Sequence, residues 1–222
     1  MTNFERRTFT GDIEFRAADG KLQAGGYAAR FGAISQDLGG FHERIAPGTF
    51  AKTLQEADIR ALFNHEAGQV LGRNRSGTLR MEEDKDGLAY EIDLPDTTLG
   101  RDVATLLERG DISGSSFGFR VISDEWGETE HGSPLRTLTQ VALRDVGPVT
   151  FPAYTDASSA LRSLAEARSL ELPDLIKAAG EDRLSEYLSE GRSEEEQEEE
   201  KEEEQESRDQ PTHAARYLHL LP

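Results

Sequence analysis

The sequence predicts an α+β or barrel-like fold. Residues 1–160 are rich in short segments with strand-like alternation, and only two helical patterns interrupt them. The strands do not alternate regularly with helices, which argues against a doubly wound parallel sheet. A chain of 222 residues suits one domain of about 150 residues with extensions, and such a domain can bury a substantial core.

The predicted strands follow one another along residues 1–160. Segments 8–16 and 22–28 alternate in part, and a turn at 18–20 predicts that they pair. Residues 59–63 read as a short buried strand. Residues 77–94 predict a hairpin around the turn signal Asp86-Gly87. Segments 118–123 and 135–143 predict two further strands, separated by a polar loop at 124–134.

Two helices are predicted within this domain. Thr49 is placed to cap a short helix over 50–56. A second helix over 97–109 ends before Gly110, a typical stop residue. One face of this second helix carries Val103, Leu106 and Leu107.

The character of the chain changes after residue 160. Residues 157–190 have helical spacing that is broken near Pro173. Residues 190–209 hold twelve acidic and three basic side chains, a net charge of −9, which is half of the whole chain's −18. This stretch has no large apolar residue, so we expect a solvated tail rather than a core. We therefore divide the chain into a main domain at 1–160, a helical extension at 161–189 and an acidic tail with a short apolar end at 190–222.

Composition argues against several classes of protein. Without cysteine there is no disulfide, thiolate metal site or thiol nucleophile. No apolar run approaches the roughly 18 residues that span a bilayer, and the first residues lack a signal-peptide pattern, so we expect an intracellular, non-membrane protein. The phosphate-binding, zinc-protease and EF-hand motifs are absent. Without clustered positive charge, general nucleic-acid binding is disfavoured.

His65 has the most suggestive setting of the five histidines. It follows the predicted strand at 59–63, and a side chain at a strand end can face a cleft. Imidazole titrates near neutral pH, which suits a general base. On local sequence alone, a surface-loop histidine is the commoner interpretation. The other four, His42, His131, His213 and His219, have no comparable anchoring.

Ser115 and Ser116 lie among small residues, after Ser113-Gly114 and just before an apolar strand that begins Phe117-Gly118. A nucleophilic serine needs close approach of the substrate and nearby amide donors, which small neighbours permit. A turn entering a strand is the commoner meaning of such a run. The spacing is not that of the Gly-x-Ser-x-Gly nucleophile elbow, which disfavours an esterase-type hydrolase.

Asp145 lies just after the predicted apolar strand at 135–143 and precedes Val146-Gly147-Pro148. It could orient a histidine, as the acid of a catalytic triad does. The alternative interpretation from the local sequence is an ion pair with Arg144 or another arginine.

Together these segments resemble the tailed-phage prohead protease family. The resemblance covers residues 5–155 in order and rests on five blocks. These are Glu5-Arg6-Arg7, residues 26–31 (GYAARF) with 39–50 (GGFHERIAPGTF), Asn64-His65-Glu66 with 70–73 (VLGR), residues 112–119 (ISGSSFGF), and Asp145-Val146 with 149–154 (VTFPAY).

The resemblance implies a serine endopeptidase distantly related to the herpesvirus assembly proteases, with a β-barrel-like sheet flanked by helices. It implies His65 as general base and Ser116 as nucleophile, with Ser115 as the fallback because the serine is doubled. Asp145 would be the third member, although many relatives have Glu there. Gly147-Pro148 also departs from the family's usual Ser-Leu.

The resemblance further implies a role in capsid maturation, inside the immature prohead in the host cytoplasm. The expected substrates are the major capsid protein precursor, scaffold segments and the protease itself, and no metal or cofactor is required. The portal and a second copy of the chain are further expected partners, whereas nucleic acid and membrane are not. The alternative is a non-enzymatic scaffold or capsid-assembly protein, which the extension at 161–189 and the acidic tail would suit.

Overall fold

The computed structural model describes residues 4–10, 13–18, 20–151, 161–162, 164–165, 169–181 and 183–189. The chain divides into two compact units, Met1–Leu184 and Ser185–Pro222. The acidic stretch and the apolar end, both within 190–222, lie outside the described residues. The division into domains at residue 160 stays a prediction.

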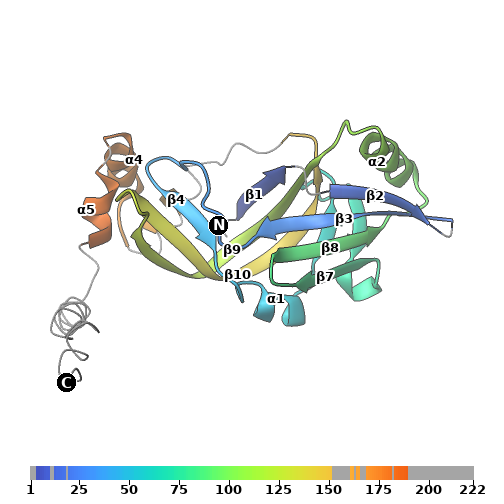
Figure 1. The fold of residues 1–222 in the computed structure, drawn as a ribbon, viewed down its shortest axis with the longest axis horizontal. Coiled ribbons are helices and arrows are strands. Elements are labelled where there is room, and N and C mark those ends of the chain that lie inside the picture. Colours follow the sequence, from blue (N-terminus) through green and yellow to red (C-terminus); the bar gives the residue numbers. More distant parts are fainter. Residues whose placement is uncertain are drawn as a thin grey trace, which may run out of the picture. The chain divides into compact units, whose positions relative to one another are not determined.

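The first sheet carries the long central hairpin of the molecule (Figure 1). Its strands run in the order β1-β9-β10-β5-β6, and β4 pairs with the N-terminal part of β10. All pairs are antiparallel except those of β10 with β4 and β5. Their bounds are β1 Glu5–Thr10, β4 His42–Ile45, β5 Arg60–Leu62, β6 Val70–Arg73, β9 Gly114–Glu128 and β10 Pro134–Val149.

The second sheet has the order β2-β3-β8-β7 and is antiparallel throughout. Its bounds are β2 Ile13–Ala18, β3 Lys21–Arg30, β7 Leu79–Glu83 and β8 Gly87–Asp93. Its inner side packs against the first sheet, because buried residues of β3 and β8 join those of β9 and β10 in one apolar cluster. The centre of this cluster includes Phe117 and Phe119, which stack with ring centroids 4.8 Å apart.

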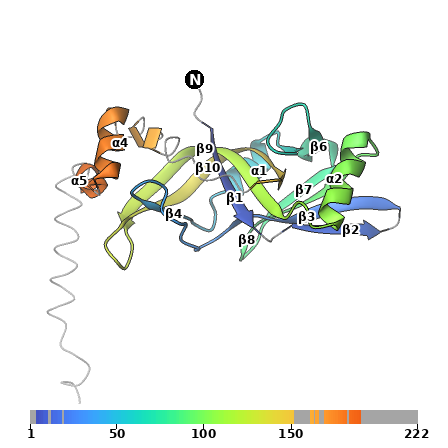
Figure 2. The ribbon, with the colours of Figure 1, turned by 90° about the horizontal axis from the view of Figure 1, so that it is seen from above.

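Two helices pack against these sheets. Helix α1 (Ala51–Glu56) contacts β10 and β7, and α2 (Thr98–Glu108) contacts β2 and β3. Figures 1 and 2 show α2 beside β2, with the β9–β10 hairpin reaching from this end toward α4 (Leu172–Gly180). The remaining elements are the 3-10 turn η1 (Asn74–Ser76) and α5 (Leu184–Ser189).

The α+β class is confirmed, but the barrel-like sheet is not. Among the described residues the strands form two separate sheets. No strand of one sheet pairs with a strand of the other, so the sheets do not close into a barrel. The predicted single strand at 8–16 is also wrong, since β1 belongs to the first sheet and β2 to the second. Alternation identifies strands but does not identify their partners, which explains both errors.

Several local predictions are confirmed. The turn before Lys21 joins β2 to β3, and the hairpin at 77–94 is β7–β8. In α2, the Thr97 hydroxyl accepts from the Gly100 amide, and Gly110 takes a left-handed φ of 77° where the helix stops. The loop predicted at 124–134 is shorter than expected, because β9 continues to Glu128.

Thr49 does not cap α1. The capping position is Phe50, and the Thr49 hydroxyl instead donates to the carbonyls of Ala46 and Leu138, at 2.6 and 2.8 Å. Thr49 is fully buried, so its hydroxyl serves to join the loop to β10. The Glu83 carboxylate accepts from the Phe50 amide at 3.0 Å and supplies the partner that this helix start needs.

In the described part of the segment predicted to be helical at 157–190, α4 and α5 are helices, whereas residues 157–160, 163, 166–168, 182 and 190 lie outside the described residues. Pro173 lies in the first turn of α4, where its missing N–H costs no helical hydrogen bond, so the predicted break is a helix start. Gly40 leaves room for the Ala179 backbone on α4, since a Cβ there would lie 3.1 Å from Ala179 Cα.

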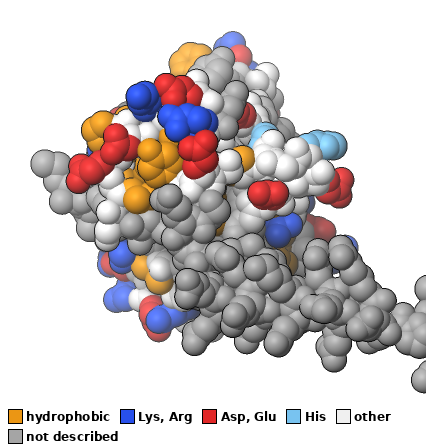
Figure 3. All heavy atoms as spheres, turned by 90° about the vertical axis from the view of Figure 1, so that its left-hand side faces the viewer, with side chains coloured by type: hydrophobic (Ala, Val, Ile, Leu, Met, Phe, Trp, Pro, Cys, Tyr) orange, Lys and Arg blue, Asp and Glu red, His pale blue; other side chains and the backbone are white. Residues whose placement is uncertain are grey.

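Acidic and basic side chains are interspersed on the face shown in Figure 3. None of the helices in the described ranges is long and apolar enough to cross a membrane.

Candidate active site

Three predicted residues meet on one face of the first sheet. His65 Nε2 lies 2.7 Å from Ser116 Oγ, and His65 Nδ1 contacts Asp145 Oδ1. The three side chains come from β9, from β10 and from the loop that follows β5. The His65 and Asp145 side chains are 6% and 7% exposed. This order of a hydroxyl, an imidazole and a carboxylate is that of a nucleophile, its base and the group that orients the base.

The loop after β5 holds His65 in an unusual backbone conformation. Asn64 and His65 both have positive φ angles, 53° and 59°, in the left-handed region that costs most residues energy. Asn64 secures the loop to the end of β10. Its amide donates to the Pro148 carbonyl at 3.1 Å, and its side chain exchanges two hydrogen bonds with Thr150. These contacts offset the backbone strain and fix the position from which His65 reaches Ser116.

Asp145 lies directly opposite Gly118 in the β9–β10 register. A Cβ on Gly118 would lie 2.9 Å from Asp145 Oδ2, so the carboxylate occupies space that only glycine leaves open. The alternative ion pair with Arg144 exists but is weaker in geometry. Arg144 Nε is 4.0 Å from Asp145 Oδ2 on a side chain that is 54% exposed.

The two neighbouring serines face opposite sides of β9. Ser116 points to His65, whereas the Ser115 hydroxyl bonds the hydroxyl of Tyr90 on β8, inside the core. Burial raises the pKa of Tyr90, and its hydrogen bond to Ser115 opposes that shift only in part. Ser115, the fallback nucleophile, is therefore not brought to the histidine.

Strand β1 contributes two further partners to Ser116. Ser116 Oγ lies 2.8 Å from the carbonyl oxygen of Arg7, which is a second possible acceptor of its proton, and Thr8 Oγ1 lies 3.2 Å from Ser116 Oγ. Thr8 is the residue directly opposite Ser116 in the β1–β9 register. Ser116 is fully buried.

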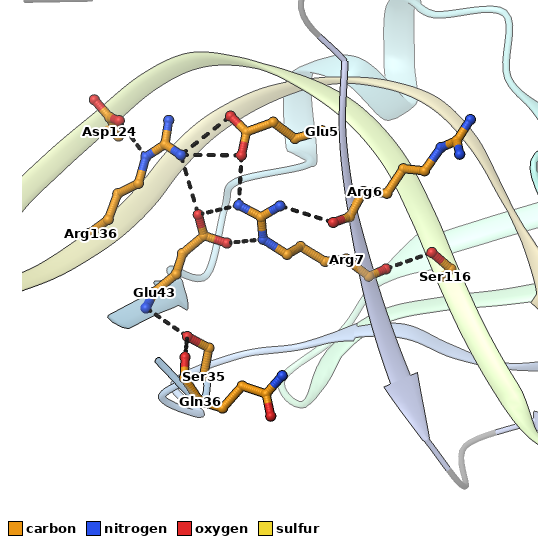
Figure 4. Close-up of polar contacts among 9 residues, drawn as sticks. All are labelled: Glu5, Arg6, Arg7, Ser35, Gln36, Glu43, Ser116, Asp124 and Arg136. Atoms are coloured by element: carbon orange, nitrogen blue, oxygen red, sulfur yellow. Dashed lines mark hydrogen bonds and ion pairs between the residues drawn. The ribbon is translucent and has the colours of Figure 1, made fainter. Parts of the chain in front are cut away.

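A buried charge cluster lies on the other side of β1 (Figure 4). We define it as Glu5, Arg7, Glu43, Asp124 and Arg136. Arg7 Nε donates to Glu43 Oε1 at 2.7 Å, and Arg7 Nη2 donates to Glu5 Oε2 at 2.6 Å.

Burial acts to lower the pKa of both arginines of the cluster. For Arg7, the carboxylates of Glu43 and Glu5 outweigh burial and raise the pKa, and neighbouring carboxylates do the same for Arg136. Both guanidinium groups therefore stay charged, and the cluster fixes β1 against β4, β9 and β10.

The two other histidines in the described ranges, His42 and His131, are not part of this site. His42 Nδ1 donates to the Ser35 carbonyl at 2.9 Å, and His131 is exposed in the turn between β9 and β10. His213 and His219 lie outside the described residues. In the part of the chain that the structure describes, no group of three or more His, Asp or Glu side chains is arranged to hold a metal ion.

Sequence reasoning missed the supporting residues of the site. The roles of Asn64, Thr8 and Gly118 depend on which strands pair and in which register. Gly118 had a visible signal, because a glycine between two buried aromatic residues in a strand indicates a close approach by another group. Asn64 had a weaker one, since asparagine tolerates a left-handed backbone.

Comparisons with known proteins give the family of the chain. The prohead protease of enterobacteria phage HK97 is 29% identical over 139 residues, which is 61% of this chain and 57% of that protein. The chain thus spans little more than half the length of that relative. The solved capsid assembly protease of bacteriophage T4 aligns with a TM-score of 0.46 and 13% identity, over 68% of this chain and 98% of that one. The model of the caudovirus prohead serine proteases matches residues 11–170, and the chain belongs to this family.

Proposed function

We propose that the protein is a serine endopeptidase of capsid maturation with Ser116 as nucleophile, His65 as general base and Asp145 as orienting acid. The observation that carries this proposal is the hydrogen-bonded chain from Ser116 Oγ through the His65 imidazole to Asp145. Membership of the prohead serine protease family supports it independently.

The geometry suits acyl transfer. His65 Nε2 takes the proton of Ser116 as Oγ attacks the scissile carbonyl, and the imidazolium then protonates the leaving amine. A water molecule, activated by the same nitrogen, releases the acyl group. Asp145 accepts from Nδ1–H, so it holds the tautomer in which Nε2 is free to act as base and stabilises the imidazolium that forms.

The substrates in this proposal are the major capsid protein precursor, scaffold segments and the chain itself, cleaved inside the immature prohead in the host cytoplasm. The name of the HK97 relative, a prohead protease, supports this class of substrate. The portal and a second copy of the chain remain proposed partners. The acidic stretch at 190–209 could package or tether the enzyme, and the relation to herpesvirus proteases stays a prediction.

The test is co-expression with the capsid precursor of the same phage, followed by intact-mass analysis of the particles. We compare wild type with Ser116→Ala, His65→Ala and the matched control Ser115→Ala. Processing should be lost in the first two variants and kept in the control. Loss in Ser115→Ala alone would move the nucleophile by one residue. Particles that assemble but stay uncleaved with wild type would contradict the proposal and favour the scaffold alternative.

A further inference from the structure

The hydrogen bonds around Ser116 Oγ place one more hydroxyl on the reacting atom. Three partners surround this oxygen: His65 Nε2 at 2.7 Å, the Arg7 carbonyl at 2.8 Å and Thr8 Oγ1 at 3.2 Å. The triad accounts for the first. The other two come from β1, which the mechanism above does not use.

Counting protons assigns the direction of each contact. A serine hydroxyl has one proton and two lone pairs. A carbonyl can only accept, so Arg7 and the free nitrogen of His65 compete for the one proton of Ser116. The Thr8 hydroxyl is the only neighbour of the three that can donate to Oγ while the base is unprotonated. Its proton is not transferred, so its donation persists before and after the serine proton leaves.

The backbone holds Thr8 in place for this contact. Thr8 is directly opposite Ser116, and the adjoining residues Arg7 and Phe9 point to the core side of β1. Arg7 is secured there by Glu5 and Glu43, through contacts of 2.6 to 2.8 Å. The donor is therefore preorganised, which is the condition under which a hydrogen bond to a developing charge assists a reaction.

We propose that Thr8 is a fourth catalytic residue, whose hydroxyl donates to Ser116 Oγ and stabilises the partial negative charge that Oγ carries during acylation, while its proton passes to His65 and its electron pair is not yet fully shared with the carbonyl carbon. In that step the Oγ–H bond breaks and the proton passes to His65 Nε2. An Oγ electron pair forms the bond to the substrate carbonyl carbon, and the carbonyl π pair moves onto its oxygen. Thr8 keeps its own proton throughout. This inference rests on the proposed function, because it assigns a role at the same serine.

The test measures the rate at which a fluorophosphonate labels Ser116 in the full-length chain, with the labelled site located by mass spectrometry. Thr8→Val has nearly the same shape but no hydroxyl, and Thr8→Ser restores the donor. Thr10→Val, two residues along the same strand and opposite Gly114, is the matched control. We expect Thr8→Val to slow labelling about tenfold, as for the loss of one neutral hydrogen bond. Thr8→Ser and Thr10→Val should stay within about twofold to threefold of wild type, as for changes that keep the bond.

Thermal midpoints separate a catalytic from a structural role. A packing role would lower the midpoint of Thr8→Val along with its rate, and Thr8→Ser would not rescue the rate. Equal labelling of wild type and Thr8→Val, or failure of Thr8→Ser to rescue, would overturn the inference and leave the triad standing. Absence of labelling in wild type would instead overturn the proposed function, and this inference with it.

Discussion

Replacing Gly118 by alanine should disable the triad without unfolding the protein. An ideal Cβ at this position lies 2.9 Å from Asp145 Oδ2, 3.2 Å from Oδ1 and 3.3 Å from Cγ. Ordinary contact begins at 3.4 Å, so Oδ2 must retreat by 0.5 Å or more, and the other two atoms must move with it. Oδ1 is the atom that contacts His65, so the shift is transmitted to the imidazole.

The expected loss of activity follows from the size of this shift. A misplacement of about 1 Å can cost about 100-fold in rate, so we expect Gly118→Ala to label with a fluorophosphonate between about tenfold and 100-fold more slowly than wild type. The free energy of unfolding should change by less than about 2 kcal/mol, because two effects oppose each other. Crowding against Asp145 destabilises the folded state, whereas replacing glycine lowers the conformational entropy of the unfolded chain and so stabilises the fold.

Gly127→Ala provides the matched control for this experiment. Gly127 lies on the same strand and has nothing within 4 Å of its ideal Cβ position, so its variant should label at the wild-type rate. Asp145→Asn gives the rate expected when the orienting carboxylate is lost altogether. Wild-type labelling by Gly118→Ala, alongside slow labelling by Asp145→Asn, would refute the reasoning, since the position of the carboxylate would then not matter.

Three further substitutions test the surroundings of the triad. Asn64→Ala removes both side-chain hydrogen bonds to Thr150 and places alanine in a left-handed backbone conformation, so the labelling rate should fall by about tenfold. Asn64→Gly tolerates that conformation, so its labelling rate should fall by less. Equal falls in the two variants would contradict a role for the φ angle. Tyr90→Phe leaves the Ser115 hydroxyl without its Tyr90 partner. The free energy of unfolding in urea should fall by about 1 kcal/mol, and the labelling rate should not change. Slower labelling would mean that the core side of β9 does affect the site. Arg136→Met leaves Arg7 as the one cation of the charge cluster beside three carboxylates and should cost about 3–5 kcal/mol in urea unfolding. A loss below about 1 kcal/mol would show that Arg136 adds no stability through the cluster.

The strands themselves could be predicted from the sequence, because alternation and turn residues are local signals. The turn before Lys21, the Asp86-Gly87 hairpin and the helix capped by Thr97 all have their cause within a few residues. The pairing of β1 with β9 could not be predicted this way, since it joins residues more than one hundred positions apart. The expectation of one barrel-like sheet was wrong for the same reason, because it required knowing which distant strands pair.

The three triad residues could be selected from the sequence only as a set. His65, Ser116 and Asp145 each have a commoner local interpretation, and the resemblance to a family is what joined them. What the resemblance left open was which of two serines faces the histidine. In a strand, successive side chains point to opposite faces, so Ser115 and Ser116 cannot both serve. The core contact of Ser115 with Tyr90 leaves Ser116 on the outer face.

The face on which Asp145 lies depends on a single extra residue in β10. Leu143 pairs with Phe119 and Val146 with Phe117, and all four side chains belong to the core. In a regular antiparallel ladder, Asp145 would stand opposite Phe117 and point into that core. The register shift between Leu143 and Asp145 places Asp145 opposite Gly118 instead, on the face of Ser116. The bulge and the glycine are therefore complementary, because the bulge turns the carboxylate to the face of Ser116 and the glycine leaves the space that it occupies there.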